Sequence, residues 1–427
     1  MASENATPVQ QPTPRQVRIA LAFTAAVLFG HLCVQAMSPL IRDYDFGAVY
    51  TAGYMVRQGK GARLYDLAEQ ARAEETVSNR PALLMIVHPP FEALFFAPLT
   101  RLSYASAYLV WGAINVLLWI LFAHLARSFA PVPRQTFQYL LLCFTFVPLW
   151  ATMVEGQTTL VLLSLYCLTY LSLERQHDFR AGAFLGLGLF RFQLVLPFAF
   201  ICLLRKKWRL MAGFTVTALL LGALSIVAVG LSGVVSYVTL LAHTLVPPAN
   251  PAYAAIAPSD MPTIRGVLSV VLTGRIATKW ISVTAALLSG LLILVTAMCW
   301  RRGDRLEGND SPGLMFAAAL AVTLITGLHV YVYDLGLLSL AIFLAIGSPQ
   351  WSRKTLWRTI VNVSIGVLYL PPVYLILGGS KRLCLLWFPV FAFTLALFVL
   401  LGKPQQGEQA FTTEATEERS RIHLNQR

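Results

Sequence analysis

Charged side chains are scarce in this sequence. They make up 12% of the 427 residues, while hydrophobic residues make up 57%. A soluble globular protein carries about 25% charged residues. A chain with half that proportion cannot cover a surface that faces water, which excludes a soluble protein. The length alone suggests two or three soluble domains, but the composition favours one body embedded in a membrane.

Motifs for nucleotides and metals are also missing. The sequence contains no Walker loop, no dinucleotide-binding glycine fingerprint and no cluster of metal-ligating residues. All six cysteines fall inside apolar runs, which argues against a disulfide framework or a zinc site. These absences disfavour ATP-driven pumping and soluble nucleotide-sugar chemistry. The sequence therefore predicts neither a metal nor a cofactor.

The charge that is present is mostly basic, with a formal net charge of +13. Basic patches with interleaved aromatic residues, which nucleic-acid binding needs, do not occur. The basic residues cluster instead in short loops between apolar runs, a pattern typical of membrane topology and anionic lipid headgroups. We therefore expect membrane lipids as partners and no nucleic acid.

Long apolar runs are abundant. A helix needs about 20 apolar residues to cross a bilayer. Charge-free runs of this order are 19–41, 102–126, 135–154, 156–173, 280–300, 311–333, 335–352, 359–380 and 383–402. The stretch 210–259 is long enough for one span and an apolar surface segment. With a hairpin at 181–204, these runs predict an all-α polytopic membrane protein of about 12 transmembrane helices.

The boundaries follow from the same runs. We expect cytoplasmic disordered segments at 1–18 and 403–427 and a transmembrane domain over 19–402. The first outer loop, 38–101, is expected to hold interfacial helices, because Phe46, Val49, Tyr50, Gly53 and Tyr54 recur at helical spacing. The part 81–101 has to lie along the membrane rather than cross it.

The positive-inside rule orients this arrangement. With the N-terminus in the cytoplasm, the main Lys/Arg clusters after the first outer loop also become cytoplasmic. The unusual polar residues then all face outward: Asp43, Asp45, His88, Glu155, Gln157, Arg191, Gln193, Arg265, His329 and Asp334. We expect one extracytoplasmic polar site covered by the outer loops.

Arg191 interrupts the apolar segment 181–204. An arginine at the bilayer centre costs about 2.5–3.5 kcal/mol, so two short helices that meet at Arg191 near the outer surface are expected. An arginine in this place can bind a phosphate in a two-pronged manner. The alternative is a buried ion pair with Asp45, Glu155 or Asp334.

Asp45 follows the first span directly, at the start of the expected interfacial helix. A carboxylate at the membrane surface suits a general base that acts on a sugar hydroxyl, and Asp43 is a nearby competitor. The alternative for Asp45 is a helix cap. His88, before Pro89 and Pro90, can bind a phosphate or simply cap and pack.

Each of the remaining polar residues has a functional and a structural interpretation. Glu155 and Gln157 either bind sugar hydroxyls or form a polar turn. Arg265 is either a second phosphate-binding cation or a solvated loop residue. His329 and Asp334 can orient a sugar or shuttle a proton, while an interfacial aromatic belt explains Tyr331 and Tyr333 equally well.

In this order the segments resemble glycosyltransferase family 87 of the GT-C superfamily. The stretches that carry the resemblance are Asp45-Phe46 to Tyr54, Leu64-Tyr65-Asp66, His88-Pro89-Pro90, Glu155-Gly156-Gln157, Arg191-Phe192-Gln193, Arg265-Gly266 and His329 to Asp334. Each motif alone is loose. Their order and common sidedness make the similarity specific from about residue 43 to residue 340.

The resemblance implies a GT-C-like bundle and an inverting transfer of a sugar, with mannose expected, from a polyprenyl-phosphate carrier. The acceptor would be a glycolipid or glycan on the outer side of the bacterial plasma membrane. The reaction would need no metal. The family's catalytic base falls on Asp45. Its hairpin usually carries lysine where this chain has Arg191, which together with Arg265 and His329 would bind the donor phosphate. Asp43, His88, Glu155, Gln157, Gln193, Tyr333 and Asp334 would bind substrate.

Two other function classes remain open at this point. A transporter or flippase of a lipid-linked sugar would share the spans and the polar cavity. It should show paired broken helices in two repeats, and the second half has no counterpart of the hairpin at Arg191. The second class is a non-catalytic membrane scaffold. The concentration of polar residues on one face argues against it.

Overall fold

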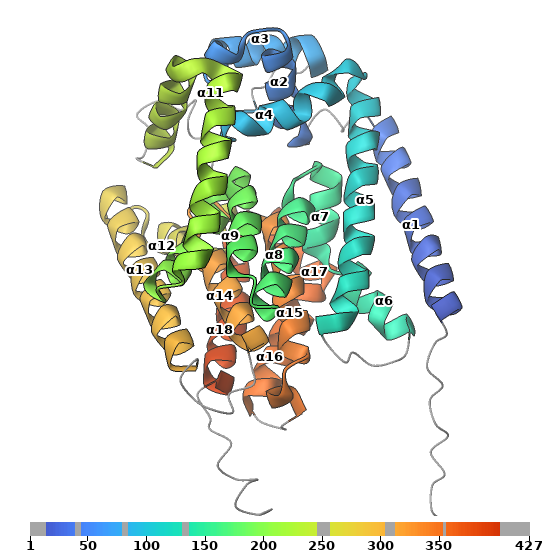
Figure 1. Ribbon diagram of the computed structural model, residues 1–427, viewed down its shortest axis with the longest axis vertical. Coiled ribbons are helices and arrows are strands. Elements are labelled where there is room, and N and C mark those ends of the chain that lie inside the picture. The colour runs from blue at the N-terminus through green and yellow to red at the C-terminus, as the bar shows by residue number, and fades with distance from the viewer. Residues whose placement is uncertain are drawn as a thin grey trace, which may run out of the picture.

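The computed structural model describes residues 14–38, 44–78, 84–129, 136–245, 257–303, 312–352 and 356–401. Within these ranges every regular element is a helix, so the all-α prediction is confirmed there. Figure 1 shows a bundle of helices with a group of short helices lying across one end. The predicted tail 403–427 lies outside the described residues. Helix α1, Pro14–Met37, begins inside the segment 1–18 that was expected to be disordered.

The helices are those of a membrane protein. Among the described residues, five stretches are long and apolar enough to cross a bilayer: Tyr104–Phe129, Asp178–Leu204, Trp208–His243, Thr278–Trp300 and Leu383–Leu401. A sixth is added if Leu356–Tyr369 and Pro371–Gly379, which are bent by 65°, form one span. Large apolar side chains such as Leu219 and Leu287 are 69% and 70% exposed on these helices, as expected of surfaces that face lipid. The count of about 12 crossings remains a prediction.

Several helices are shorter than the sequence runs suggested. The run 135–154 forms two helices, α6 (Thr136–Phe144) and α7 (Val147–Glu155). The break between them precedes Pro148 in the first turn of α7, where proline is tolerated because the first N–H groups have no helical partner. The bend between α16 (Leu356–Tyr369) and α17 (Pro371–Gly379) likewise coincides with proline at the start of α17.

The centre of the bundle is made of three short segments. These are α8 (Thr159–Glu174), α14 (Pro312–Thr326) and the continuous stretch of η7 (Val332–Leu337) and α15 (Leu338–Ile346). Nearly all of α14 is buried, and it packs against α15, α18 (Trp387–Leu401) and α13 (Thr278–Gly303). Helix α8 has 16 residues and is therefore about 24 Å long. It is shorter than the hydrocarbon core of a bilayer, which is ~30 Å thick.

The stretch Asp178–Leu204, which is long enough to cross a bilayer by length and composition, instead forms the hairpin predicted around Arg191. It consists of α9 (Asp178–Leu187), the 3-10 turn η4 (Gly188–Arg191) and α10 (Phe192–Leu204). A Cβ added to Gly182 would lie 1.8 Å from the carbonyl oxygen of Leu210, and one added to Gly186 would lie 2.8 Å from Cβ of Thr217. The starts of α9 and α11 (Trp208–Leu245) therefore lie side by side and run in parallel, so α10 must bring the chain back.

The short helices across the end of the bundle form a unit that we call the cap. It contains α2 (Phe46–Arg57), η2 (Gly61–Arg63), α3 (Leu67–Ser78), α4 (Pro90–Phe96) and η3 (Ala97–Arg101), and α2 to α4 are seen at the top of Figure 1. The described part of 81–101 does not cross the bundle. Helix α2 is present as predicted, but its aromatic face meets protein, because Phe46 and Tyr50 pack against Tyr104 of α5 (Tyr104–Phe129).

Helix α11 joins the cap to the bundle. Its helical dihedral angles are interrupted at Gly230, where φ is 70° and ψ is 174°, a conformation essentially restricted to glycine. The part before Gly230 packs on α9, and the part after it packs on the cap, where Tyr237 lies 5.0 Å from Tyr65 between ring centroids. The helix thus has two parts, as one span and a further apolar segment would, and the expected place of that segment along the membrane surface stays a prediction.

The remaining described elements complete the second half. They are η6 (Pro258–Asp260), α12 (Ile264–Leu272), η8 (Pro349–Ser352) and η9 (Leu383–Leu386). The start of α1 and the end of α18 both lie at the end of the bundle opposite the cap (Figure 1). The turn from α10 to α11, which contains Lys206 and Lys207, lies at that end too, since α11 rises from it toward the cap.

Candidate functional site

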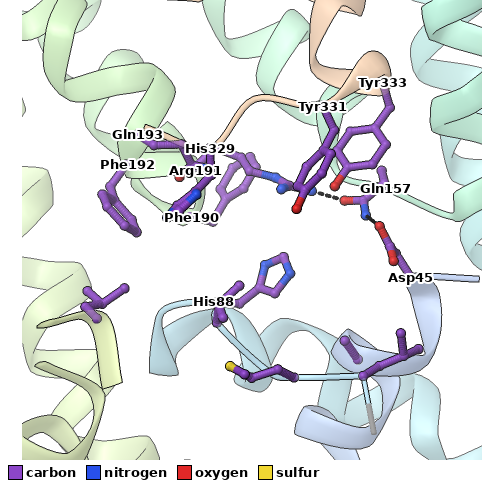
Figure 2. A pocket seen from close by; sticks show the side chains of 15 residues that line it. Asp45, His88, Gln157, Phe190, Arg191, Phe192, Gln193, His329, Tyr331 and Tyr333 are labelled. Atoms are coloured by element: carbon purple, nitrogen blue, oxygen red, sulfur yellow. Dashed lines mark hydrogen bonds between the residues drawn. The ribbon is translucent and has the colours of Figure 1, made fainter. Parts of the chain in front are cut away.

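A cavity of about 310 Å³, lined by both polar and apolar side chains, lies between the cap and the bundle. Seven of the predicted site residues line it: Asp45, His88, Gln157, Arg191, Gln193, His329 and Tyr333. Figure 2 shows that they come from two sides, with His88 and Asp45 on the cap and the others on the ends of the bundle helices. Residues far apart in the sequence thus line one cavity.

Four predicted residues do not line the cavity. Glu155 and Asp334 lie directly beside residues that do line it. Arg265 is in the first turn of α12, half-buried and outside the lining. Asp43 lies outside the described residues, so the choice between Asp43 and Asp45 as the base is not tested.

Asp45 occupies the N-cap position of α2, yet its side chain makes no capping hydrogen bond. Its carboxylate oxygen Oδ2 instead accepts a hydrogen bond of 2.6 Å from Nε2 of Gln157. The backbone N–H of Asp45 donates to Oε2 of Glu155 at 3.2 Å. The helix-cap reading therefore does not describe this carboxylate, which is directed toward the α7–α8 turn.

The turn between α7 and α8 supplies both of these partners. Gly156 ends α7 in the left-handed conformation, with φ of 64°, and its position leaves room only for hydrogen, since an added Cβ would lie 2.8 Å from Cβ of Phe46. This tight turn brings Glu155 and Gln157 against the start of α2. The two residues that were expected to bind sugar hydroxyls thus both hydrogen-bond to Asp45.

Glu155 has an unusual acidity. Burial, and after it the nearby charge of Asp45, raise the pKa of its carboxyl from 4.5 to about 7, although the N–H of Asp45 opposes the shift. Two carboxyl groups this close resist simultaneous ionisation. Glu155 therefore changes its charge near neutral pH, next to the carboxylate proposed as the base.

Arg191 is buried, with only 5% of its surface exposed. Its guanidinium donates to Oε1 of Gln157 and, through Nε, to Oγ1 of Thr158 at 3.2 Å. The guanidinium carbon lies 5.5 Å from the ring centroid of Tyr333, within the range of a cation–π contact. Gln157 therefore links the carboxylate of Asp45 to the guanidinium of Arg191.

The alternative of a direct ion pair for Arg191 is not realised. Within the ranges described, no ion pair of 4.0 Å or less joins it to Asp45, Glu155 or Asp334. Asp334 is fully buried, and its Oδ2 accepts the backbone N–H of Tyr331 at 3.0 Å. Its Oδ1 has no partner among the described residues. The cavity thus presents a buried cation whose charge is not neutralised by direct contact.

His329 is neutral at physiological pH. Burial, and after it the charge of Arg265, lower the pKa of this histidine from 6.5 to about 4. It can therefore donate or accept one hydrogen bond in the cavity, but it is not a cation there. Tyr331, which also lines the cavity, stays protonated because burial raises the pKa of its hydroxyl.

Sequence reasoning missed three residues of this site. Thr158 accepts a hydrogen bond from Arg191. Tyr331 lines the cavity, although the sequence had suggested for it only a place in an aromatic belt. Glu92 is bonded to His88, with 2.7 Å between Oε2 and Nδ1. His88 lies just before α4 and Glu92 lies in its first turn, so their closeness in the sequence was a usable signal.

Metal binding has no obvious place in the part of the chain that the structure describes. There, no group of three or more histidine, cysteine, aspartate or glutamate side chains is arranged to hold an ion. The polar groups that converge on the cavity are a carboxylate, a guanidinium, two imidazoles, amides and phenols. This set suits the recognition of a phosphate and of hydroxyl groups.

Comparison with known families gives a consistent result. The sequence model of glycosyltransferase family 87 matches residues 87–327, which is more than half of the chain. The matched range includes His88, Gln157 and Arg191. His329 lies just beyond its end, and Asp45 lies well before its start. A search of curated proteins found no match.

Proposed function

The chain belongs to glycosyltransferase family 87, and on this premise we propose that it transfers a sugar from a polyprenyl-phosphate carrier to an acceptor outside the plasma membrane of a bacterium. Mannose is the sugar that we expect, and a glycolipid or glycan is the expected acceptor. The reaction proceeds with inversion at the anomeric carbon. Because the donor already carries an activated sugar, the proposal requires no metal and no cofactor.

One observation carries the proposal. Asp45 and Arg191 face the same cavity from different walls, and only the side chain of Gln157 lies between them in the hydrogen-bonded chain. Inverting transfer needs a base on one side of the sugar and stabilisation of the leaving group on the other. A carboxylate and a guanidinium on separate walls meet this requirement.

The proposed chemistry assigns one role to each wall. Asp45 takes the proton from the acceptor hydroxyl as its oxygen attacks the anomeric carbon. The bond from that carbon to the phosphate oxygen breaks, and its electron pair remains on the lipid phosphate. Arg191 stabilises the growing negative charge from a preorganised position. Arg265 is close enough to lower the pKa of His329, so it assists through the local field.

The lipid carrier is supported by the depth of the cavity. The cavity lies at the cap-side ends of α8, η4 and η7, and α8 is about 6 Å shorter than a hydrocarbon core. A phosphate attached to a membrane-embedded tail reaches such a position without leaving the bilayer. The basic turn between α10 and α11 at the opposite end favours a cap that faces away from the cytoplasm.

The test is a transfer assay with purified protein in lipid nanodiscs. The protein is incubated with polyprenyl-phosphate mannose and a membrane glycolipid extract, and products are identified by mass spectrometry. Asp45→Asn should lower the rate by about a hundredfold to ten-thousandfold while donor binding is retained. An Asp45→Asn variant with full activity would contradict the role of the base.

A matched control is available on the cap. Asp66 accepts the backbone N–H of Ala68 at 2.9 Å at the start of α3, away from the cavity. Asparagine serves equally well at helix starts, so Asp66→Asn should leave the rate unchanged. If the wild-type protein moves the intact donor across a vesicle membrane without forming a new glycoside, the transporter alternative replaces this proposal.

A further inference from the structure

The cap holds a buried pair of residues that the proposed reaction has not yet used. His88 and Glu92 are joined by 2.7 Å between Nδ1 and Oε2, and their side chains are 14% and 4% exposed. The other oxygen of Glu92, Oε1, is buried and has no partner in the ranges described. A carboxylate so deeply buried costs free energy unless it accepts a hydrogen bond. For Glu92 the hydrogen-bond donor is the imidazole of His88.

This pairing decides which nitrogen of His88 meets a ligand. The carboxylate keeps a proton on Nδ1, because an ionised carboxylate can only accept a hydrogen bond. Nε2 is then the nitrogen left for the cavity. Figure 2 shows the ring of His88 directed into the cavity, toward the wall that carries Arg191 and Tyr331.

The backbone of His88 is also held firmly. Its carbonyl oxygen accepts a hydrogen bond of 2.7 Å from the hydroxyl of Tyr65, and Tyr65 contacts Tyr237 on the upper part of α11. Pro89 and Pro90 follow and restrict the backbone further. Both the backbone and the Nδ1 atom of His88 are thus held by hydrogen bonds. Such restraint preorganises a binding group.

We propose that His88, positioned by Glu92, is the cap-side ligand of the lipid phosphate and faces Arg191 across the cavity. The inference rests on the proposed function and adds to it a second phosphate contact and a positioning residue. When the bond between the anomeric carbon and the phosphate oxygen breaks, the electron pair stays on that oxygen and the hydroxyl proton goes to Asp45. In the bound state His88 is an imidazolium: Nδ1–H donates to Glu92 and Nε2–H donates to the phosphate, and both protons stay on the ring during the transfer.

The arrangement has a structural consequence. Arg191 belongs to the hairpin of the bundle, and His88 belongs to the cap, so one phosphate bound by both would connect the two units. The same phosphate chemistry occurs in the donor and in a phosphorylated acceptor lipid. The experiment therefore has to separate donor binding from acceptor binding.

The first arm measures binding without catalysis. Farnesyl phosphate, a short prenyl phosphate, is titrated against the full-length protein in nanodiscs, with farnesol as the ligand without phosphate. His88→Gln and Glu92→Gln should each weaken farnesyl phosphate binding about tenfold, the usual effect of losing one hydrogen bond to a charged group, and should leave farnesol binding unchanged. Glu69→Gln, which removes another buried carboxylate of the cap, should leave both unchanged.

The second arm asks whether Glu92 acts through His88. In a double-mutant cycle, Glu92→Gln should weaken farnesyl phosphate binding in the wild-type background but have no further effect when His88→Gln is already present. An equal loss in both backgrounds overturns the positioning role, because a merely structural effect does not depend on residue 88. Thermal unfolding of each variant shows whether the fold is retained.

The third arm is kinetic and separates this inference from the proposed function. In the transfer assay, His88→Gln should raise KM for the polyprenyl-phosphate sugar about tenfold and leave KM for the acceptor unchanged. A rise in acceptor KM alone overturns the assignment to the lipid phosphate. If the wild-type protein transfers sugar while both variants bind farnesyl phosphate normally, the inference fails and the proposed function stands.

Discussion

The two walls of the cavity differ in chemistry and in construction. The cap wall presents Asp45 and His88, and the bundle wall presents Arg191. Backbone contacts at Gly182 fix the hairpin that carries Arg191, whereas side-chain hydrogen bonds orient the groups of the cap. The proposed base and the proposed phosphate ligand are therefore held by separate parts of the fold. Their relative placement depends on the few contacts that cross the boundary.

The largest effect should follow from removal of the bundle cation. Arg191→Ala leaves Gln157 and Thr158 without their donor and the lipid phosphate without its main counter-charge. Loss of one partner from a buried charged network costs about 3–5 kcal/mol, so the affinity for farnesyl phosphate should fall at least a hundredfold. Equilibrium titration in nanodiscs measures this.

Arg191→Lys is the matched control for charge. Lysine keeps the positive charge but lacks the planar guanidinium that reaches Gln157 and Thr158 together. We expect it to retain binding within about tenfold of wild type, because the charge itself survives. An Arg191→Ala variant with unchanged affinity would show that the bundle wall does not bind the phosphate.

The comparison also shows what the sequence could reveal. Arg191 was predictable because a charge inside an apolar run is costly, and the hairpin around it follows from the same cost. Asp45 stood out at the end of the first span. The partners of Asp45 were not predictable, since Glu155 and Gln157 are more than 100 positions away and no local pattern records that contact.

The fold was predictable to a similar extent. Hydropathy identified the long helices α5 and α13, because a lipid-facing helix is apolar over its whole length. It did not show that α14 ends at Thr326, since the apolar run continues to residue 333. The burial of both faces of α2 likewise depends on the cap as a whole.

The second prediction concerns the construction of the bundle wall. In Gly182→Ala, the new Cβ would lie 1.8 Å from the carbonyl oxygen of Leu210, so α9 and α11 must separate. Such overpacking should destabilise the protein by about 3 kcal/mol and lower donor affinity through displacement of Arg191. Thermal unfolding and farnesyl phosphate titration measure the two effects.

Gly222 of α11 provides the control, because an added Cβ there would meet nothing within 4 Å. Gly222→Ala should be neutral or stabilising by up to about 1 kcal/mol, as expected for alanine in a helix. Equal losses in the two variants would show that the close approach at Gly182 is not what fixes the hairpin.

The third prediction uses the charge of Glu155 at the boundary. Its pKa is raised from 4.5 to about 7 in the folded protein, so the folded state binds this proton more tightly than the unfolded state. Stability should therefore fall as the pH rises from about 4.5 to 7 and then level off. Glu155→Gln should remove about 2 kcal/mol of this dependence, measured by thermal unfolding between pH 5 and pH 8.

A glutamate of the cap with the opposite shift serves as the control. The hydrogen bond from Lys60 lowers the pKa of Glu69 below its usual value, so its titration lies below the range tested. Glu69→Gln should keep the wild-type slope between pH 5 and pH 8. An unchanged slope in Glu155→Gln would contradict the raised pKa of Glu155, which comes first from its burial and then from the charge of Asp45.

The smallest effect should come from the contact that crosses the boundary. Gln157 donates to Asp45 at 2.6 Å and accepts from Arg191, whereas Gln70 is equally buried but bonds only within the cap, to Leu64 and Ile86. Each alanine variant loses a bridging amide, so each should lose about 1 kcal/mol of stability. Only Gln157→Ala should also slow transfer, by about tenfold, because base and cation then lose their common alignment. The transfer assay measures both rates. Similar rates for the two variants would mean that Asp45 and Arg191 stay aligned without the amide of Gln157.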